Sequence, residues 1–162
     1  MNSLTHNNKK YNYFFGNLYQ LTDIFKLNIK LTQSFNTILA LHRNVESFNY
    51  SRILFDEDLQ EYYKNKSESY YFIIYDKNNI VTTSRIIINK NNGYINMVHT
   101  NIKYRGHGFC NKNISKLISI TNVKQYTLNV LINNEHAVKC YLSCGFTIIK
   151  MNKQEYTMRF IN

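Results

Sequence analysis

The sequence predicts a single α/β domain in which a mixed, mostly antiparallel sheet is flanked by helices. Its 162 residues, 44% of them hydrophobic, suffice for one sizeable core but not for two full domains. Near residue 68 the apolar residues change from the spacing of helices to that of strands. We therefore expect one domain over 1–162, with a helical segment over 1–68 and a core that carries the sheet over 69–162.

The first segment has mainly helical signals. From Leu31 to Lys66 apolar residues recur at intervals of three and four, which predicts two helices. The recurring positions are Phe35, Ile38, Leu39 and Leu41, then Ile53, Leu54, Leu59 and Tyr62. The first 30 residues have weaker patterns, from which we expect one strand near Tyr11 to Phe15 and a short helix.

The second segment has the signals of strands. Its first three runs are YYFIIYD, IVTTSRIII and YINMVHT, and the short turns between them are rich in Asn, Lys and Gly. This pattern predicts an antiparallel meander. The elements expected after it are a helix at 114–120, a strand at 126–132, a helix at 134–144, and closing strands at 146–150 and 155–161.

Cysteine usage and hydropathy bear on the compartment. Cys110, Cys140 and Cys144 are an odd number without the spacing of a disulfide framework, which favours reduced thiols. No apolar run approaches the roughly 20 residues of a membrane span, and the first 15 residues lack the hydrophobic stretch of a signal peptide. We expect a cytoplasmic protein, with the nucleus as an open alternative, and no membrane partner.

The net charge of +10 is concentrated in the second half of the chain. Residues 77–162 contain twelve Lys and Arg against two acids, Glu135 and Glu155, whereas the acids and bases of residues 1–76 balance. A field of one sign attracts anionic partners, such as a phosphorylated cofactor or nucleic acid. Lysines on solvated faces would give the same count, so the charge alone does not identify the partner.

The stretch YRGHGFCNKN, Tyr104 to Asn113, joins the end of a predicted strand to the start of a helix. N–H groups in the first turn of a helix lack internal partners and carry partial positive charge, which suits them to bind a phosphate. Gly106 and Gly108 allow a close approach of the backbone, and Arg105 adds a cation. An ordinary turn between a strand and a helix would have a similar sequence, so this stretch needs support from elsewhere in the chain.

That support comes from the stretch NEHAVKCYLSCGF, residues 134–146. Together the two stretches resemble the GCN5-related N-acetyltransferase (GNAT) superfamily, whose phosphate loop reads Q/R-x-x-G-x-G/A and whose later helix commonly reads N-x-x-A-x-x-x-Y-x-x-x-G-F. Arg105 and Gly108 match the loop, and the helix is matched by Asn134, Ala137, Tyr141, Gly145 and Phe146. The resemblance covers about residues 69–162. Cys110 departs from the Gly or Ala of the loop, and a thiol there narrows the space for a pyrophosphate.

The resemblance implies acetyl-CoA as cosubstrate and no metal. The pyrophosphate would lie on the loop, at Arg105, Gly106, His107, Gly108, Phe109 and Cys110. The pantetheine arm would pair with the preceding strand at Met97, Val98 and His99. A backbone N–H of that strand would polarise the thioester carbonyl, where negative charge develops during acyl transfer.

Tyr141 is the residue that the resemblance favours for side-chain chemistry. In the family this tyrosine often protonates the leaving thiolate, and a phenol of pKa about 10 is protonated at neutral pH. Asn134 lies seven residues earlier, within roughly 20° of the same face of a helix, and is expected to contact the cofactor. Ordinary structural roles remain open for both: Tyr141 as a core aromatic and Asn134 as a helix N-cap.

The general base is less well defined. His99, on the strand beside the thioester, has a suitable unperturbed pKa of about 6.5. Alternation along the strand could turn its ring away from the site, and several family members use a chain of waters instead. His107 is expected to face solvent or phosphate.

The cysteines suggest no further chemistry. His136, Cys140 and Cys144 recur at intervals of four, but structural zinc sites take four ligands in compact pairs, and the chain has no second pair. Cys140 and Cys144 are better interpreted as small buried side chains. No base partner supports Cys110 as a nucleophile.

The sequence thus predicts an N-acetyltransferase that moves an acetyl group directly from acetyl-CoA to a primary amine. The stretch FDEDLQE, Phe55 to Glu61, lies where the family builds its acceptor side and would favour a cationic amine, on a small molecule or a protein, although acids also suit a helix start. A homodimer remains open. The alternatives are a non-catalytic CoA-binding module and a basic nucleic-acid-binding protein on the same scaffold. Nucleic acid is disfavoured because no recognition-helix motif is present.

Overall fold

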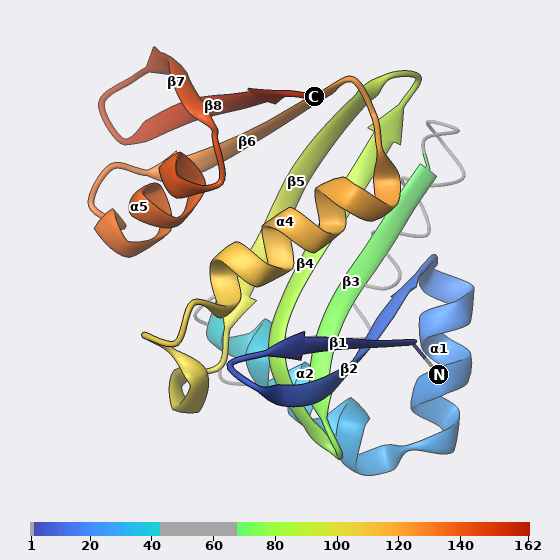
Figure 1. Cartoon of the computed structure of the whole chain (residues 1–162). Helices are drawn as coiled ribbons and strands as arrows, with labels where there is room; N and C mark the ends of the chain where they lie inside the picture. The colour runs from blue at the N-terminus through green and yellow to red at the C-terminus, as the bar shows by residue number, and fades with distance from the viewer. Residues whose placement is uncertain (1, 43–67) are drawn as a thin grey trace.

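The structure, a computed structural model, describes residues 2–42 and 68–162 (Figure 1). Its strands form one eight-stranded sheet in the order β1-β2-β3-β4-β5-β6-β8-β7. The strands are β1 (Asn2–His6), β2 (Lys9–Gly16), β3 (Glu68–Asp76), β4 (Asn79–Asn89), β5 (Asn92–Thr100), β6 (Gln125–Leu131), β7 (Thr147–Met151) and β8 (Glu155–Ile161). All neighbouring strands run antiparallel except β5 and β6, which are parallel. The mixed, mostly antiparallel sheet predicted from the sequence is confirmed.

Helices cover both faces of the sheet (Figure 1). They are α1 (Leu18–Leu27), α2 (Ile29–His42), α4 (Phe109–Thr121) and α5 (Glu135–Ser143), with a short 3₁₀ turn, η1 (Ile102–Tyr104). Leu21 of α1 and Phe35 of α2 pack in one apolar cluster, and Ile114 and Leu117 of α4 pack in another. Each cluster takes alternate residues of β3, so the two cores lie on opposite faces of the sheet.

Strand β3 shows why its sequence is almost continuously apolar. Tyr71 and Ile73 are buried against α1 and α2, and Phe72 and Ile74 are buried on the side of α4. A strand covered on both faces has no solvent side on which polar residues would alternate. The run YYFIIYD therefore marks the middle of the molecule.

The amino terminus differs from the prediction. A second strand, β1, pairs with β2 through a turn at Asn7 and Asn8, both of which have positive φ. Two such residues give the twist of a tight hairpin, and asparagine tolerates this conformation better than most residues. The sequence reasoning missed β1 because a short, mostly exposed edge strand has little apolar alternation.

The other elements agree with the prediction apart from their bounds. Helix α4 begins at Phe109, five residues earlier than expected, because Gly108 caps it in the left-handed region. The second helix predicted between residues 31 and 66 lies outside the described residues. In the described ranges, the helices are too short or too polar to cross a membrane.

Candidate active site

Strands β5 and β6 separate soon after they meet. Their pairing comprises Asn92 with Gln125, Gly93 with Tyr126 and Tyr94 with Thr127, and within the described residues no further pair follows. From there β6 continues with β8 on its other side, while β5 stays on β4 (Figure 1). The edge of β5 from Ile95 to Thr100 therefore offers backbone groups to which an extended ligand could bind as a strand does.

A bulge interrupts this part of β5. The pairing with β4 shifts register between Thr83 and Arg85, and Met97 has a φ of 51°. The hydroxyl of Thr83 donates to the Met97 carbonyl at 3.4 Å. Bulges reorient backbone groups locally and are frequent beside functional sites. Of the residues predicted to line the pantetheine, Met97 is buried, and Val98 and His99 are half-buried.

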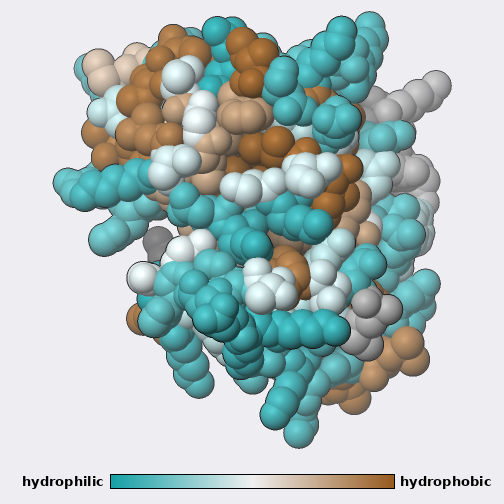
Figure 2. Space-filling model, in the orientation of Figure 1, coloured by the Kyte–Doolittle hydropathy of each residue, from teal (hydrophilic) through white to brown (hydrophobic). Residues whose placement is uncertain are grey.

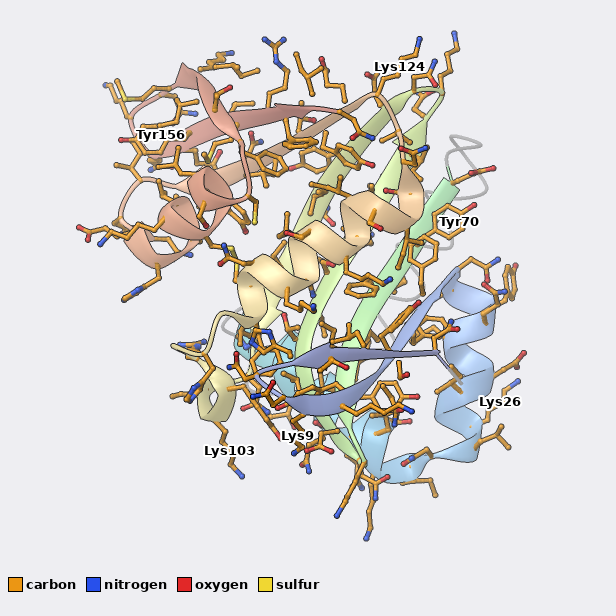
Figure 3. The ribbon with its side chains drawn as sticks, in the orientation of Figure 1. Lys9, Lys26, Tyr70, Lys103, Lys124 and Tyr156 are labelled. Carbon is orange, nitrogen blue, oxygen red and sulfur yellow. A yellow bond between two sulfur atoms is a disulfide. The ribbon has the colours of Figure 1, made fainter. Side chains whose placement is uncertain are left out.

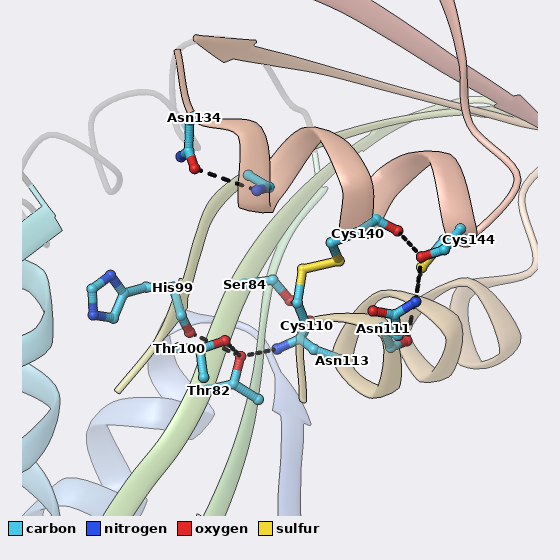
Figure 4. Close-up of a disulfide and its surroundings, with 12 residues drawn as sticks. Thr82, Ser84, His99, Thr100, Cys110, Asn111, Asn113, Asn134, Cys140 and Cys144 are labelled. Carbon is cyan, nitrogen blue, oxygen red and sulfur yellow. Dashed lines mark hydrogen bonds between the residues drawn. A yellow bond between two sulfur atoms is a disulfide. The ribbon is translucent and has the colours of Figure 1, made fainter. Parts of the chain in front are cut away.

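A buried polar network lies behind the bulge and joins α4 to the sheet (Figure 4). The side chain of Asn113, fully buried in α4, accepts from the Ser84 hydroxyl at 2.6 Å and donates to the Thr82 hydroxyl at 3.2 Å. The Thr82 hydroxyl in turn donates to the carbonyl of His99 at 2.8 Å. These bonds satisfy buried polar groups that would otherwise be costly, and they fix β5 relative to α4.

The start of α4 has the properties expected of an anion site. The first helical hydrogen bond runs from the Lys112 N–H to the Gly108 carbonyl. In the described part of the chain, the N–H groups of Gly108, Phe109, Cys110 and Asn111 have no partner. The first turn of α4 contains no acid whose charge would offset the positive end of the helix dipole.

The loop before α4 leaves room for a ligand. A Cβ added at Gly106 would meet nothing within 4 Å. Arg105 is exposed, and its Nε donates to the carbonyl of Thr100 at 3.0 Å, which holds the side chain beside the end of β5. The donors and the open space fit a pyrophosphate on this loop.

His107 has an exposed side chain, as expected, and its backbone carbonyl has partners that were not expected. Its side chain is exposed, but its carbonyl accepts hydrogen bonds from the side chains of His6 and Asn7 in the β1–β2 turn. The sequence reasoning missed both donors. No local pattern joins residues about 100 positions apart in the chain.

The prediction of reduced cysteines is wrong for two of the three. Cys110, in the first turn of α4, forms a disulfide with Cys140 of α5, with their Cα atoms 6.2 Å apart (Figure 4). The odd cysteine is Cys144, a half-buried free thiol. Sequence spacing did not reveal the pair because the two helices come together only in the fold. The sulfur of Cys110 is thus bonded toward α5, and its N–H remains at the helix start.

The motif that resembles the family is a helix with both ends capped. Asn134 is the N-cap of α5, and its side chain accepts from the Ala137 N–H at 3.3 Å. At the other end the Phe146 N–H donates to the Tyr141 carbonyl and the Gly145 N–H to the Leu142 carbonyl, each at 3.0 Å. This is a Schellman motif, and Gly145 supplies its positive φ of 93°.

The environments of Asn134 and Tyr141 differ. Asn134 is exposed and lies outside the helix proper, so the helical rotation between the two residues does not place both on one face. Tyr141 is buried, with 6% of its surface exposed, and its ring packs against Phe146 at 6.1 Å between centroids. Burial, with a smaller contribution from Cys144, raises the pKa of Tyr141 well above its usual range. The phenol therefore stays protonated at neutral pH.

His99 carries the second predicted catalytic side chain. Its ring is directed away from α4, α5 and the disulfide (Figure 4). Alternation along the strand, disturbed by the bulge at Met97, sets this direction. The structure thus brings the loop, Tyr141 and the backbone of β5 to the region of α4 and α5, and places the imidazole on the other side.

Cys140 is engaged in the disulfide, which disrupts the stripe formed by His136, Cys140 and Cys144. The described residues contain no group of three or more His, Cys, Asp or Glu that could hold a metal ion.

Strands β5 and β6 are parallel and separate, and helix α4 begins between them in the chain. This arrangement is typical of acyltransferases that use acetyl-CoA. The model of the acetyltransferase (GNAT) family matches residues 35–146, and the chain belongs to this family. It is thus an acetyltransferase, and acetyl-CoA is its cosubstrate. The curated proteins include no match to its sequence.

Solved structures of the same fold are similar over most of their length. A spermidine N-acetyltransferase from Vibrio cholerae, in complex with CoA and spermine, is 19% identical with a TM-score of 0.61 and covers 92% of this chain and 95% of its own. The N-acetyltransferase PseH from Campylobacter jejuni, in complex with acetyl-CoA, is 18% identical with a TM-score of 0.55, over 70% of this chain and 81% of its own. A dodecameric structure of the Vibrio cholerae enzyme is 21% identical with a TM-score of 0.55, over 72% of this chain and 75% of its own.

Proposed function

We propose that the chain transfers an acetyl group directly from acetyl-CoA to a primary amine. The observation that carries this proposal is the presence of two features at one place: an edge of β5 and a helix start with four N–H groups, all without a partner among residues 2–42 and 68–162. The first suits the extended pantetheine arm and the second suits the pyrophosphate. The amine is supported by the family and by the neighbours named for N-acetyl transfer.

The proposed roles follow from the chemistry of each group. Acetyl-CoA supplies a thioester. The N–H groups from Gly108 to Asn111 and the exposed cation of Arg105 hold the anionic end of the cofactor. Backbone N–H groups of Met97, Val98 or His99 stabilise negative charge on the thioester oxygen.

Tyr141 is the proposed acid that protonates the departing thiolate, because its phenol is protonated at neutral pH and its position matches the tyrosine of the family motif. Burial raises the pKa of the phenol and by itself makes it a weaker acid, so the proposal rests on the motif and not on the shift. His99 stays the candidate base toward the amine, approached from the side opposite to α4. Asn134 uses its side-chain oxygen as an N-cap, and its amide nitrogen is the group proposed to reach the cofactor.

The acceptor is proposed to be a cationic amine, and a polyamine is the first to test, because the first neighbour is named for spermidine. The acidic stretch Phe55 to Glu61, on which the sequence expectation rested, lies outside the described residues.

The proposed partner besides the amine is a second copy of the chain. The edge strand β7 exposes Ile148, Ile149 and Met151, and Figure 2 shows an apolar area over β7, β8 and α5. The Vibrio cholerae neighbour is described as dodecameric. Light scattering at several protein concentrations tests this point, and a monomer at every concentration would contradict it.

One experiment tests the donor and the reaction together. Thermal unfolding is followed with acetyl-CoA, CoA, ATP and a short DNA duplex, and CoA release is then measured with spermidine, an aminoglycoside, a lysine peptide and a peptide with a free amino terminus. Ligand at about 100 times its dissociation constant stabilises the fold by about 2.7 kcal/mol. Stabilisation by both CoA species and release of CoA that depends on an amine support the proposal. Stabilisation without transfer to any amine would favour a non-catalytic binder, and stabilisation by DNA alone would favour a nucleic-acid-binding protein.

A further inference from the structure

The β1–β2 turn contacts the phosphate loop directly. The Nε2 of His6 donates to the carbonyl oxygen of His107 at 2.6 Å, and the Nδ2 of Asn7 donates to the same oxygen at 3.4 Å. The side chains of Lys9, at the start of β2, and of Lys103, in η1, extend from the same end of the molecule in Figure 3. A hairpin from the amino terminus therefore meets the segment that begins α4.

The imidazole of His6 also packs against the start of α4. Its ring centroid lies 4.5 Å from that of Phe109, the first residue of α4. A Cβ added to Gly108 would lie 3.5 Å from His6 Cε1, so the ring also covers the backbone of the N-cap. Tyr11 and Tyr104 pack edge-on against the same Phe109 ring, at 5.1 and 5.8 Å between centroids. These contacts leave the His6 ring little freedom to turn away from the loop.

The hairpin is itself anchored to the sheet. Lys9 forms an ion pair with Asp76, the last residue of β3, and β2 pairs with β3 from Asn12 to Gly16. The His6 donor is therefore fixed relative to the central strands.

The geometry of one peptide group connects this contact to the anion site. The carbonyl of His107 and the N–H of Gly108 belong to the same peptide unit, which is trans and planar, so they point in opposite directions. Two side chains of the hairpin hold the carbonyl, and this fixes the direction of the N–H away from the hairpin. Gly108 N–H is the first of the four N–H groups at the start of α4 that have no partner among the described residues.

We propose that His6, assisted by Asn7, is a positioning residue for the acyl donor: it fixes the peptide between His107 and Gly108 so that the Gly108 N–H binds the pyrophosphate. This inference rests on the proposed function, because it requires the pyrophosphate on this loop. Neither residue belongs to the loop or to the helix motif. Without the hairpin, this peptide of the glycine-containing loop would have to become ordered when the cofactor binds, and the affinity for the cofactor would be lower.

The test compares two acyl donors that differ only in the anionic end. Acetyl-CoA contains the pyrophosphate, and S-acetylpantetheine lacks it. His6→Phe keeps a ring against Phe109 but removes the donor, whereas His6→Gln restores an amide donor. With acetyl-CoA, His6→Phe should raise KM about fivefold, the loss of roughly one hydrogen bond, with kcat unchanged. His6→Gln should recover much of this loss, and Asn7→Ala should have a smaller effect, since its bond is longer.

With S-acetylpantetheine none of these variants should change KM. Thr5→Ala, at an exposed position of β1, is the matched control and should leave the KM for both acyl donors unchanged. A merely structural role of His6 predicts a different result, an equal loss with both donors together with a lower melting temperature.

The outcomes separate this inference from the proposed function. If calorimetry shows that wild-type protein and His6→Phe bind CoA equally well, the role of His6 is overturned and the proposed function stands. The same holds for equal losses with CoA and pantetheine. Wild-type protein that binds no CoA overturns both proposals. Calorimetry with CoA and pantetheine requires no acceptor, so the role of His6 is tested even before the amine is known.

Discussion

Tyr141 has two roles in the structure, and one substitution separates them. Its carbonyl and ring belong to the C-terminal cap of α5, and its hydroxyl is the proposed acid. Tyr141→Phe keeps the ring against Phe146 and removes only the hydroxyl. We expect kcat to fall by about 100-fold, at the low end of what a general acid contributes. The affinity for acetyl-CoA and the melting temperature should be nearly unchanged, and an unaltered kcat would remove Tyr141 from the mechanism.

The raised pKa of Tyr141 also predicts how the protein responds to alkali. Burial disfavours the phenolate, so the folded state keeps its proton at a pH where the unfolded chain, with a pKa of about 10, has lost it. The unfolded state then binds fewer protons, and stability falls as pH rises above about 10. Below that pH the contribution is complete and kcat should show no decline from ionisation of Tyr141. Urea unfolding of wild-type protein and Tyr141→Phe at increasing pH checks this, because the decline should be shallower in the variant.

Single residues differ in how far the sequence reveals their roles. Asn134 and Gly145 are predictable, because an asparagine before a helix and a glycine after one act through neighbours in the chain. His6 is not predictable, since its partner is the carbonyl of His107, 101 positions away. The direction of the His99 ring also required the structure, because the bulge at Met97 breaks the alternation on which the sequence argument depends.

The disulfide sets how α4 and α5 act together. The Cys110–Cys140 bond joins the first turn of α4 to the residue before Tyr141, and Asn111 of α4 adds a hydrogen bond to Ser143 of α5. The helix with the proposed phosphate donors is thus connected to the helix with the proposed acid. Disulfides are more typical of oxidising compartments than of the cytoplasm. The cytoplasmic location is therefore a prediction from the sequence that the disulfide does not support.

Reduction of this disulfide should destabilise the protein measurably. The bond closes a loop with a sequence separation of 30, and opening it should lower the free energy of unfolding by about 3–4 kcal/mol. This corresponds to a fall of roughly 10 °C in melting temperature. Cys140→Ala should melt lower than wild-type protein and not respond to dithiothreitol. Cys144→Ala keeps the bond and should respond as wild-type protein does; three free thiols in the native oxidised protein would contradict the prediction.

The elements could be predicted where the chain has a long apolar run bounded by turns rich in Asn, Lys and Gly. Strands β3, β4 and β5 are such cases, and they were found within a few residues. Strand β1 was missed, because it has one buried residue, Leu4. Its link to the candidate site is a hydrogen bond from His6 to a loop that is distant in the sequence. Similarly, the start of α4 was placed too late, because the first turn reads FCNK and shows no helical period before Ile114.

Across the whole molecule, the family motifs correctly predicted the class of fold and a helix after the glycine-containing loop, although the predicted helix began five residues too late. The distribution of charge adds a property that no single element has. The net charge is +10, and twelve of the bases lie in the half that contains the loop and α4. This excess attracts the phosphates of the proposed cofactor, and it also repels itself in the compact state.

Salt should therefore have opposite effects on stability and on binding. Raising the ionic strength from about 0.1 M to about 1 M shortens the screening length from about 10 Å to about 3 Å. Repulsion among the bases weakens, so the melting temperature of the free protein should rise. Attraction for the phosphates weakens as well, so the dissociation constant of acetyl-CoA should increase several-fold, while that of uncharged S-acetylpantetheine should not. Calorimetry and thermal unfolding at matched ionic strengths measure the two effects. An acetyl-CoA affinity independent of salt would mean that the excess charge lies on faces remote from the cofactor and serves another anion.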